Sequence, residues 1–263
     1  MPELAVRGVR FNYQLDGPTD GTPLVLSNSL ASNLDMWEAQ LPVLLARGWR
    51  VLRYDNRGHG RTEAVAGPYS VEMLADDVIA LMDAVGFTTA HYCGLSLGGM
   101  IGQMLATRHP ARLRTLTLCA TAAYMGPVDL WADRIAAVTT GGMAAVVDGT
   151  LARWFTAAGH QRLAPSIAAI RAGILTTSVT GFSACCGAIR DMDQRDTLRA
   201  ITLPTHVIVG EDDPGTPVTA AQFMHERIRG SRLTILPGAA HLANIEQRVA
   251  FNAALFDFFD RQR

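Results

Sequence analysis

The chain of 263 residues is long enough to bury one large core, and 49% of its residues are hydrophobic. Its 23 basic and 24 acidic residues leave a formal net charge of −1, so no global field would attract nucleic acid or an anionic membrane surface. No stretch reaches the roughly 18 consecutive apolar residues of a membrane span, and the first residues lack the apolar core of a signal peptide, so we expect a soluble, cytoplasmic protein. Cys93, Cys119, Cys185 and Cys186 show no CxxC spacing, which argues against a disulfide framework or a zinc site.

The predicted elements alternate between strand and helix along the first half of the chain. Residues 4–17 alternate polar and apolar side chains and end in turn residues, as an antiparallel edge hairpin would. Ser70 can cap a later helix whose apolar side chains recur at three- and four-residue steps, and Gly86 can end it. Apolar, β-branched runs typical of buried parallel strands occupy residues 23–28, 49–55, 90–96, 114–120, 205–210 and 232–238. This alternation predicts an α/β fold with a mostly parallel, doubly wound sheet of about eight strands.

Residues 122–200 interrupt this alternation. They run as helix after helix, rich in alanine, methionine and paired glycines, with no convincing strand. The chain returns to the sheet where Pro204 precedes the next strand. We therefore predict a core formed by residues 1–121 and 201–263, with residues 122–200 inserted as a helical cap.

Ser96 lies in the stretch GLSLG, residues 94–98, which matches the G-x-S-x-G pattern of a nucleophile elbow. An apolar strand precedes this stretch and a helical pattern follows it, which is the context that the motif requires. A sharp strand-to-helix turn holds its central residue at positive φ and crowds the neighbouring backbone, so the flanking positions accept only small side chains. The pattern predicts that Ser96 is an exposed nucleophile.

A serine hydroxyl is a weak nucleophile at neutral pH and needs a base within hydrogen-bonding reach. Among the seven histidines, His241 lies in a loop after the last predicted strand and before the final helix. Loops at the carboxyl ends of parallel strands converge on the ligand crevice of a doubly wound sheet, so His241 is the preferred base. His59, in a glycine-rich loop after an earlier strand, is the alternative.

The acid that orients this base is expected in the loop after the preceding strand, which contains Glu211, Asp212 and Asp213. Asp213 is preferred because it stands just before a proline, where the chain must turn. The resulting order along the chain, Ser96, Asp213 and then His241, is the one described for α/β-hydrolases.

Two backbone N–H groups are needed to stabilise the tetrahedral oxyanion that such a serine would generate. One belongs to Leu97, which follows the nucleophile directly. The second is expected from the loop after the strand at residues 23–28, where Leu30 is the candidate donor.

These stretches together resemble the 3-oxoadipate enol-lactonases of the α/β-hydrolase superfamily. The resemblance extends over nearly the whole chain, through LSNSLASNLDMWEAQ, RYDNRGHGRT, GLSLGGMIGQ and HLANIEQ. Within the predicted cap, RWFT at residues 153–156 and CCGAIRDMD at residues 185–193 resemble stretches associated with this lactonase.

The resemblance implies an α/β-hydrolase fold and a small-molecule substrate, an enol-lactone with an acetate arm. Water would hydrolyse it to 3-oxoadipate during bacterial breakdown of aromatic acids, in the β-ketoadipate pathway. The same resemblance implies a Ser-His-Asp mechanism through an acyl-enzyme, with no metal and no organic cofactor.

The acetate carboxylate of such a substrate requires a cation or several hydrogen-bond donors, and a planar guanidinium suits it. The predicted cap offers Arg190, Arg153 and Arg134, of which Arg190 is preferred. Trp131 and Trp154 are candidates for the walls around the lactone ring. The alternatives are surface ion pairs for the arginines and simple core packing for the tryptophans.

Other functions fit fewer of these features. A general carboxylesterase or another lactonase would use the same three catalytic groups, because the cap decides the substrate. A ligand receptor on a hydrolase scaffold is a further alternative, which steady turnover would exclude. No nucleic-acid or membrane partner is expected, and the sequence predicts no oligomeric state.

Overall fold

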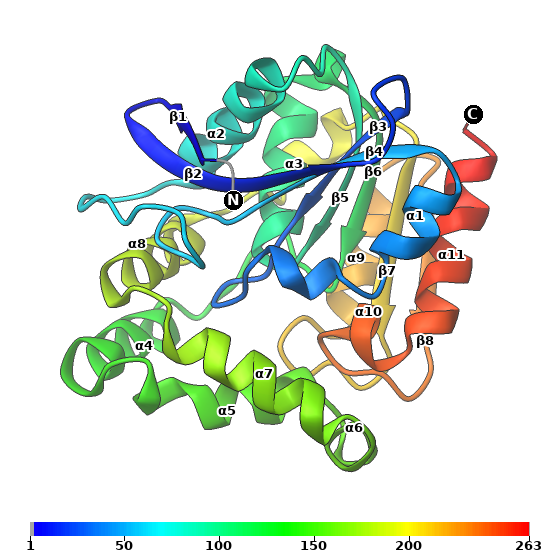
Figure 1. Ribbon diagram of the computed structural model, residues 1–263. Helices are drawn as coiled ribbons and strands as arrows, with labels where there is room; N and C mark the ends of the chain where they lie inside the picture. Colours follow the sequence, from blue (N-terminus) through cyan, green and yellow to red (C-terminus); the bar gives the residue numbers. More distant parts are fainter. Residues whose placement is uncertain (1–2, 263) are drawn as a thin grey trace.

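An eight-stranded β-sheet forms the centre of the computed structural model, which describes residues 3–262 (Figure 1). The strands are β1 (Glu3–Val6), β2 (Val9–Asp16), β3 (Thr22–Ser27), β4 (Trp49–Tyr54), β5 (Ala90–Leu95), β6 (Leu113–Cys119), β7 (Thr205–Gly210) and β8 (Arg232–Leu236), in the order β1-β2-β4-β3-β5-β6-β7-β8. β1 and β2 form an antiparallel hairpin, β2 is also antiparallel to β4, and the remaining neighbours are parallel. The predicted, mostly parallel sheet with an antiparallel edge hairpin is confirmed.

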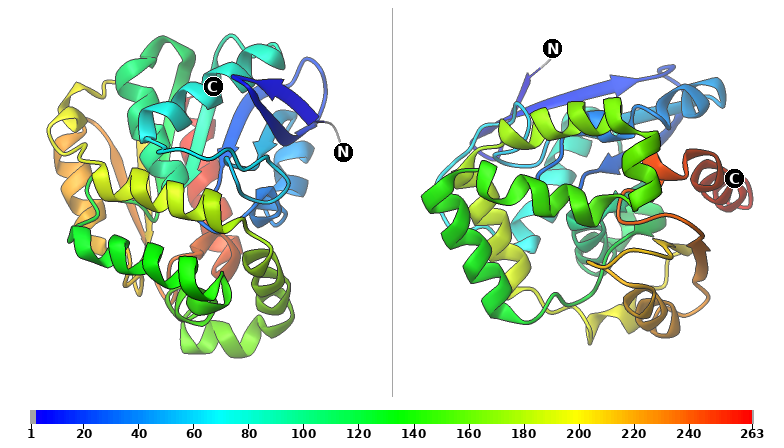
Figure 2. Two further views of the ribbon diagram at one scale, coloured as in Figure 1. Left: turned by 90° about the vertical axis from the view of Figure 1, so that its left-hand side faces the viewer. Right: turned by 90° about the horizontal axis from the view of Figure 1, so that it is seen from below.

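Helices cover both faces of this sheet. They are α1 (Leu41–Ala46), α2 (Val71–Ala84), α3 (Leu97–Arg108), α9 (Val218–Arg227), α10 (Ala243–Glu246) and α11 (Arg248–Asp260), with short 3-10 helices η1 (Leu34–Trp37), η2 (Pro110–Arg112) and η3 (Thr197–Ala200). In the left view of Figure 2, α2 and α3 lie in front of the sheet and α11 lies behind it. This doubly wound arrangement brings the carboxyl ends of β3, β5, β7 and β8 to one edge, where a ligand crevice is expected.

Local sequence signals explain where α2 begins and ends. Ser70 precedes the helix, and its side chain accepts a hydrogen bond from Met73 N at 3.1 Å. This bond satisfies one of the N–H groups that the first turn leaves free. Gly86 follows the helix with a φ of 80°, a left-handed conformation that glycine adopts without strain. Both predicted boundary residues are confirmed.

In the described chain, five α-helices occupy the segment predicted as a cap, and the 3-10 helix η3 ends it. The five α-helices are α4 (Val128–Gly141), α5 (Ala144–Trp154), α6 (Ala157–Arg162), α7 (Ala164–Leu175) and α8 (Val179–Asp191). α4 to α7 lie below the sheet in Figure 1, beyond the edge where the loops converge. Within residues 3–262, no helix is by itself long and apolar enough to cross a membrane. Only α7 and α8 taken together reach the necessary length and apolar composition, and the two helices are bent by 95° relative to each other.

The last of these helices, α8, approaches the core closely through two glycines. Gly58, in the loop after β4, has a φ of 67°, and a Cβ atom added to it would lie 2.3 Å from Gly181 Cα. Ser178 N, just before α8, donates a hydrogen bond to Gly58 O at 3.3 Å. Because neither glycine has room for a side chain, this contact determines where α8 rests on the core.

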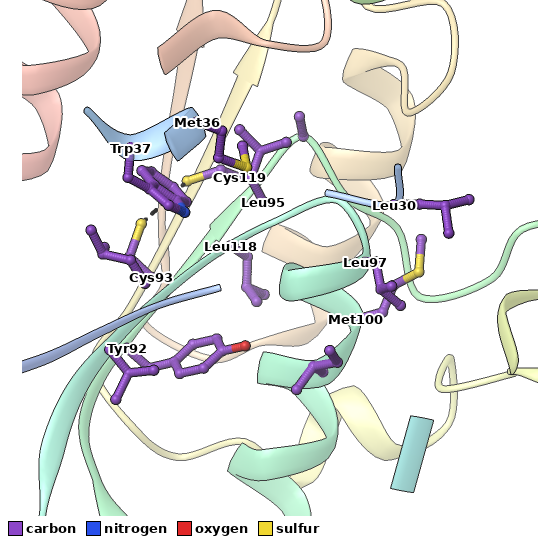
Figure 3. Close-up of a cluster of buried hydrophobic side chains, with 14 of the residues drawn as sticks. Leu30, Met36, Trp37, Tyr92, Cys93, Leu95, Leu97, Met100, Leu118 and Cys119 are labelled. Atoms are coloured by element: carbon purple, nitrogen blue, oxygen red, sulfur yellow. Dashed lines mark hydrogen bonds between the residues drawn. The ribbon is translucent and has the colours of Figure 1, made fainter. Parts of the chain in front are cut away.

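Buried apolar side chains support the turn between β5 and α3 (Figure 3). Those with a relative exposure of 1% or less include Cys93, Leu95, Leu97, Met100, Leu118 and Cys119. All four cysteines are buried free thiols. The turn therefore rests on a closely packed, apolar base, which suits a position that must hold one backbone geometry.

Candidate active site

Ser96 lies at the turn between β5 and α3, with a φ of 58° and a ψ of −114°. A positive φ strains a residue that has a side chain. A Cβ atom at Gly94 would lie 2.1 Å from Gly98 O, and one at Gly98 would lie 2.4 Å from Ser27 O. Both glycines are therefore required by the close approach of β3, β5 and α3. The predicted strand-turn-helix context of Ser96 is confirmed.

Three hydrogen bonds hold this strained turn in place. Ser96 N donates to Cys119 O at 2.9 Å, and Thr121 Oγ1 donates to Ser96 O at 2.8 Å. Gly98 N donates to Asn28 O at 3.0 Å, which ties the start of α3 to the loop after β3. The backbone is thus fixed on two sides. The prediction that Ser96 is exposed is wrong as far as the outer surface is concerned, because Ser96 is buried, with a relative exposure of 9%, and its side chain lines an internal cavity.

Asp213 and His241 come from the loops after β7 and β8 and contact each other directly. Asp213 Oδ2 lies 2.7 Å from His241 Nδ1. Thr216 Oγ1 donates to the same Oδ2 at 2.6 Å, while Gly215 N and Thr216 N donate to Oδ1 at 2.8 Å and 3.0 Å. Both carboxylate oxygens therefore have firm partners, and one of those partners is the imidazole.

The surroundings of Asp213 keep its carboxylate charged. Burial alone would raise its pKa, but the charge of His241 and hydrogen bonds from His241 and Thr216 outweigh burial and lower the pKa. A charged carboxylate only accepts hydrogen bonds, so His241 Nδ1 carries the proton in this contact. Nε2 of a neutral His241 is then free to accept a proton, as a general base requires.

Ser96 and His241 line the same cavity, whose volume is about 430 Å³. Within residues 3–262, no hydrogen bond joins the Ser96 hydroxyl to the His241 ring. Catalytic hydrogen bonds are often long in substrate-free enzymes and tighten in the substrate complex. The structure therefore brings the predicted nucleophile and base together in one cavity, and their roles stay a prediction.

The two candidate oxyanion donors have free N–H groups. In the part of the chain that the structure describes, neither Leu30 N nor Leu97 N donates a hydrogen bond to the protein. Leu30 lines the same cavity as Ser96, and Leu97 is the first residue of α3, where helix N–H groups lack intrahelical partners. Buried N–H groups are rarely left unpaired, so this pair is suited to a ligand oxygen.

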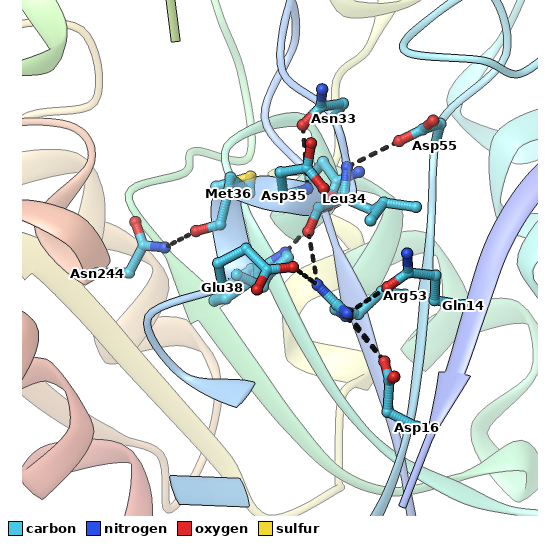
Figure 4. Close-up of polar contacts among 12 residues, drawn as sticks. Gln14, Asp16, Asn33, Leu34, Asp35, Met36, Glu38, Arg53, Asp55 and Asn244 are labelled. Atoms are coloured by element: carbon cyan, nitrogen blue, oxygen red, sulfur yellow. Dashed lines mark hydrogen bonds and ion pairs between the residues drawn. The ribbon is translucent and has the colours of Figure 1, made fainter. Parts of the chain in front are cut away.

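The loop that carries Leu30 is anchored from three directions (Figure 4). Asp55 Oδ1 accepts from Leu34 N at 2.7 Å, and Asn244 Nδ2 in α10 donates to Met36 O at 2.9 Å. Arg53, which is almost fully buried, places its guanidinium 3.5 Å from Leu34 O. These contacts hold the loop in one position relative to the elbow, as an oxyanion site requires.

Residues of the predicted cap also line the cavity of Ser96 and His241, which is called the catalytic cavity after the roles predicted for these two residues. Trp131 and Arg134 project from α4, and Arg153 and Trp154 from the end of α5. Three of these four were predicted as substrate-binding residues, and Arg153 was a named alternative. The structure thus brings two tryptophans and two arginines to the same space as Ser96.

Arg190 requires a correction to the sequence analysis. It is not among the residues that line this cavity, and its guanidinium binds Asp191 instead, at 2.7 Å and 2.9 Å. The hydrogen bond and charge of that neighbouring carboxylate raise the pKa of Arg190. Arg190 therefore occupies a surface ion pair, and Arg134 and Arg153 replace it as candidates for binding a carboxylate.

Arg134 and Arg153 make the catalytic cavity electropositive. Neither forms a salt bridge within residues 3–262, and the described residues that line the cavity include no aspartate or glutamate. Burial lowers the pKa of both guanidinium groups, and the charge of Arg134 lowers that of Arg153 further. Two partly buried cations that repel each other favour an anion placed between them.

His59, the alternative base, lies elsewhere. Its ring is fully buried, Nδ1 contacts Arg57 O at 3.0 Å, and in the described chain Nε2 has no hydrogen-bond partner. Burial lowers the pKa of His59 to about 4. Since His59 does not line the catalytic cavity, its position favours His241 as the base.

Sequence reasoning missed two supporting residues. Thr216 binds the Asp213 carboxylate through its hydroxyl and backbone, and a threonine three residues after the acid was a usable local signal. Glu246 is buried, and its Oε2 accepts a hydrogen bond from Ala240 N, just before His241, at 2.8 Å. Its charge near the end of a predicted loop gave no sign of that burial.

Comparison with known proteins identifies relatives across most of the chain. A family model described as the alpha/beta hydrolase fold matches residues 22–247. The 3-oxoadipate enol-lactonase 2 of Acinetobacter baylyi is 36% identical over 252 residues, which cover 96% of this chain and 94% of that protein. A putative carbamate hydrolase of Variovorax paradoxus is 32% identical, with 95% of this chain and 96% of that protein covered.

A solved structure agrees with these relatives. The crystal structure of the enol-lactonase from Burkholderia xenovorans matches this fold with a TM-score of 0.96 at 40% sequence identity. The match covers 98% of this chain and 100% of that one, so it includes the helices of residues 122–200 as well as the sheet.

Proposed function

This chain belongs to the α/β-hydrolase family, and on that premise we propose that it hydrolyses 3-oxoadipate enol-lactone to 3-oxoadipate through an acyl-enzyme on Ser96. The reaction would serve bacterial breakdown of aromatic acids through the β-ketoadipate pathway. One observation carries the proposal: the cavity that holds Ser96 and His241 also holds Arg134 and Arg153, and no aspartate or glutamate among the described residues lines it. A neutral ester would not need these cations, whereas a lactone with a carboxylate arm would pair with them.

The first half of the proposed reaction forms the acyl-enzyme. His241 Nε2 takes the Ser96 proton as the hydroxyl attacks the lactone carbonyl, and Asp213 stabilises the imidazolium that results. The N–H groups of Leu30 and Leu97 stabilise the oxyanion, each by about 3 kcal/mol. Collapse of the tetrahedral intermediate breaks the ring C–O bond and expels an enolate.

The enolate remains tethered to the acyl chain, so reclosure of the ring would compete at high effective concentration. The imidazolium of His241 returns its proton to the enolate, which makes His241 neutral again, and tautomerisation of the resulting enol to the ketone removes that nucleophile. A water molecule, deprotonated by His241, then attacks the acyl-enzyme and releases 3-oxoadipate with Ser96 restored. The substrate carboxylate would stay with Arg134 and Arg153 through both halves.

A carboxylesterase or a lactonase for neutral substrates is the second candidate, because the family includes such enzymes and the catalytic groups would be the same. The discriminating comparison uses two five-membered enol-lactones, one with the acetate arm and one with a methyl group in its place. Charge-assisted hydrogen bonds contribute about 1.5–3 kcal/mol, so we expect kcat/KM to favour the acetate compound by about 10- to 100-fold.

Loss of ultraviolet absorbance of the lactone measures this turnover directly. Equal kcat/KM for the two lactones would reject the carboxylate proposal and favour the esterase alternative. A single turnover followed by no further reaction would instead support a ligand receptor. Ser96→Ala is the blank in each assay, because it keeps the cavity and removes the proposed nucleophile.

A further inference from the structure

A second cavity, of about 350 Å³, lies beside the catalytic cavity. One wall is α7, where Ala169 and Gly173 leave room, and the opposite wall is the segment at residues 31–39, which includes η1. α7 lies below η1 in Figure 1. Ala31 and Trp154 line both cavities, so the two spaces meet at these residues.

The charged side chains of the two cavities have opposite sign. The catalytic cavity has Arg134 and Arg153, whereas the described residues that line the second cavity include Asp35 and Glu38 and no basic side chain. Glu38 is paired with Arg53 at 2.6 Å, whereas Asp35 forms no salt bridge with any residue in the range 3–262. A carboxylate arm is therefore attracted to the first cavity and repelled from the second.

The walls of the second cavity are mostly apolar. Ile170 and Ile174 of α7 face it together with Leu242 and Ile245, on the chain just after His241. Such a lining binds hydrocarbon and penalises any polar group that it cannot pair. Its volume lies within the range of small-molecule pockets, about 300–1,000 Å³. An uncharged alkyl chain fits this combination of size, charge and polarity.

Trp154 separates this space from the catalytic groups. Its indole stacks on the His241 ring, with centroids 6.4 Å apart and an interplanar angle of 24°. Its backbone O accepts a hydrogen bond from Leu242 N at 3.1 Å, so the main chain here is fixed independently of the indole. Removal of the indole would open the second cavity toward Ser96 without breaking that backbone contact.

We propose that the second cavity is a binding pocket for the uncharged alkyl chain of an acyl group, and that Trp154 is the partition that restricts its use. The inference rests on the proposed function in one respect, that Ser96 is the acylated nucleophile. The reaction is ordinary ester hydrolysis: Ser96 displaces the alcohol, the alkyl part of the acyl group extends past residue 154, and water releases the fatty acid. Trp154 thereby determines specificity for compact acyl groups over longer ones.

The test measures chain-length preference as a ratio. For each protein, kcat/KM is determined for p-nitrophenyl octanoate and p-nitrophenyl acetate, and their quotient cancels any loss of active protein in that preparation. Each methylene moved from water into apolar surroundings contributes about fourfold. Trp154→Ala should therefore raise the octanoate-to-acetate ratio by about tenfold or more over wild type, and Trp154→Phe should raise it less.

A second substitution tests whether the octanoyl chain lies in the second cavity. Gly173→Leu places a side chain in the second cavity, and the first atom of that side chain is tolerated because a Cβ there lies 3.8 Å from Asn33 Nδ2. Ala172→Leu is the matched control, on an exposed position of the same helix that does not line the cavity. In the Trp154→Ala background, Gly173→Leu should return the ratio toward wild type and Ala172→Leu should not.

Each remaining outcome rejects the inference. An unchanged ratio in Trp154→Ala shows that Trp154 is not the partition. A raised ratio that Gly173→Leu leaves intact shows that the octanoyl chain lies outside the second cavity. Neither result affects turnover of the enol-lactone by wild type, which tests the proposed function separately. Conversely, wild type could fail to turn over the enol-lactone while the octanoate-to-acetate ratios change as expected. That result would reject the proposed function and would still support the alkyl-chain pocket.

Discussion

Glu246 in the core and Thr156 in the cap are joined by two hydrogen bonds to a single carboxylate oxygen. Thr156 N donates to Glu246 Oε1 at 3.0 Å, and Thr156 Oγ1 donates to the same oxygen at 2.6 Å. Because Oε2 binds Ala240 N, one buried carboxylate connects the cap to the residue before His241. The position of the proposed base is therefore linked to the position of the cap.

This linkage predicts that Glu246→Gln lowers both stability and kcat. An amide keeps one accepting oxygen, but its NH2 group must face an N–H or O–H donor that the carboxylate had satisfied. A buried donor left without a partner costs about 1–3 kcal/mol. Thermal unfolding should show the loss of stability, and lactone turnover should show a lower kcat as the His241 loop becomes less well fixed.

Glu226→Gln is the matched control for that substitution. Glu226 lies in α9 with a mostly exposed side chain, and its pair with Arg227 is long at 3.7 Å. Exposed substitutions of this kind usually change stability by no more than about 0.5 kcal/mol. If Glu246→Gln behaves like Glu226→Gln in both assays, the carboxylate does not support the catalytic loop.

Replacing each of the two candidate bases, His241 and His59, should affect kcat differently. His241→Gln should reduce kcat on the order of 10⁴-fold or more, because it removes the group that accepts the Ser96 proton. His59→Gln should keep kcat near the wild-type value when activity is expressed per folded molecule, because His59 does not line the catalytic cavity. Circular dichroism gives the folded fraction, and a reversed ranking would transfer the role of base to His59.

The elements of the fold and the position of Ser96 could be predicted because their causes are local. The G-x-S-x-G pattern is itself a local signal, and Gly94 is required by a backbone contact with Gly98 within the same turn. Helix α2 carries its own boundary signals in Ser70 and Gly86. Parallel strands also bring the loops at their carboxyl ends to one edge of the sheet, whatever the side chains are. This rule was enough to predict that Asp213 and His241 lie near each other, as they do in the structure.

The cap residues were harder to predict because their causes are distant in sequence. Arg134, Arg153 and Arg190 have the same chemistry, and only the packing of α4, α5 and α8 decides which of them face the cavity. Arg190 did have a local signal against it, since the neighbouring Asp191 is an available ion-pair partner. The Glu246 contact spans 90 residues and has no local signature at all.

Burial of His59 predicts a pH dependence of stability between pH 6.5 and about 4. Burial lowers the pKa of His59 from 6.5 to about 4, so between these values the unfolded chain binds a proton that the folded chain does not. Stability contributed by this group therefore falls as pH decreases from 6.5 to 4, by at most about 1.4 kcal/mol per pH unit. Asp213 acts in a lower window, since its folded pKa lies below 3.8 and its contribution is lost only as pH falls through that region.

Thermal unfolding of wild type and His59→Gln at pH 7.5, 6.5, 5.5 and 4.5 measures this contribution. The variant should lose less stability than wild type between pH 6.5 and 4.5. His206 adds a slope of the same sign to both proteins, because burial and then the charge of Arg232 lower its pKa to about 3. Parallel curves for the two proteins would show that His59 does not titrate differently on unfolding.

Replacing Arg134 or Arg153 should selectively weaken binding of the substrate that has a carboxylate. Arg134→Gln and Arg153→Gln should each raise KM for the acetate-bearing enol-lactone by about 10- to 100-fold, the value of a charge-assisted hydrogen bond of about 1.5–3 kcal/mol. Both substitutions should change KM for the methyl-substituted lactone less than KM for the acetate-bearing lactone, because the methyl compound has no carboxylate. Arg190→Gln is the matched control and should leave both substrates near wild type, since its guanidinium pairs with Asp191. A KM that responds to Arg190→Gln and not to the other two would return the carboxylate site to α8 and reject the assignment made from the cavity.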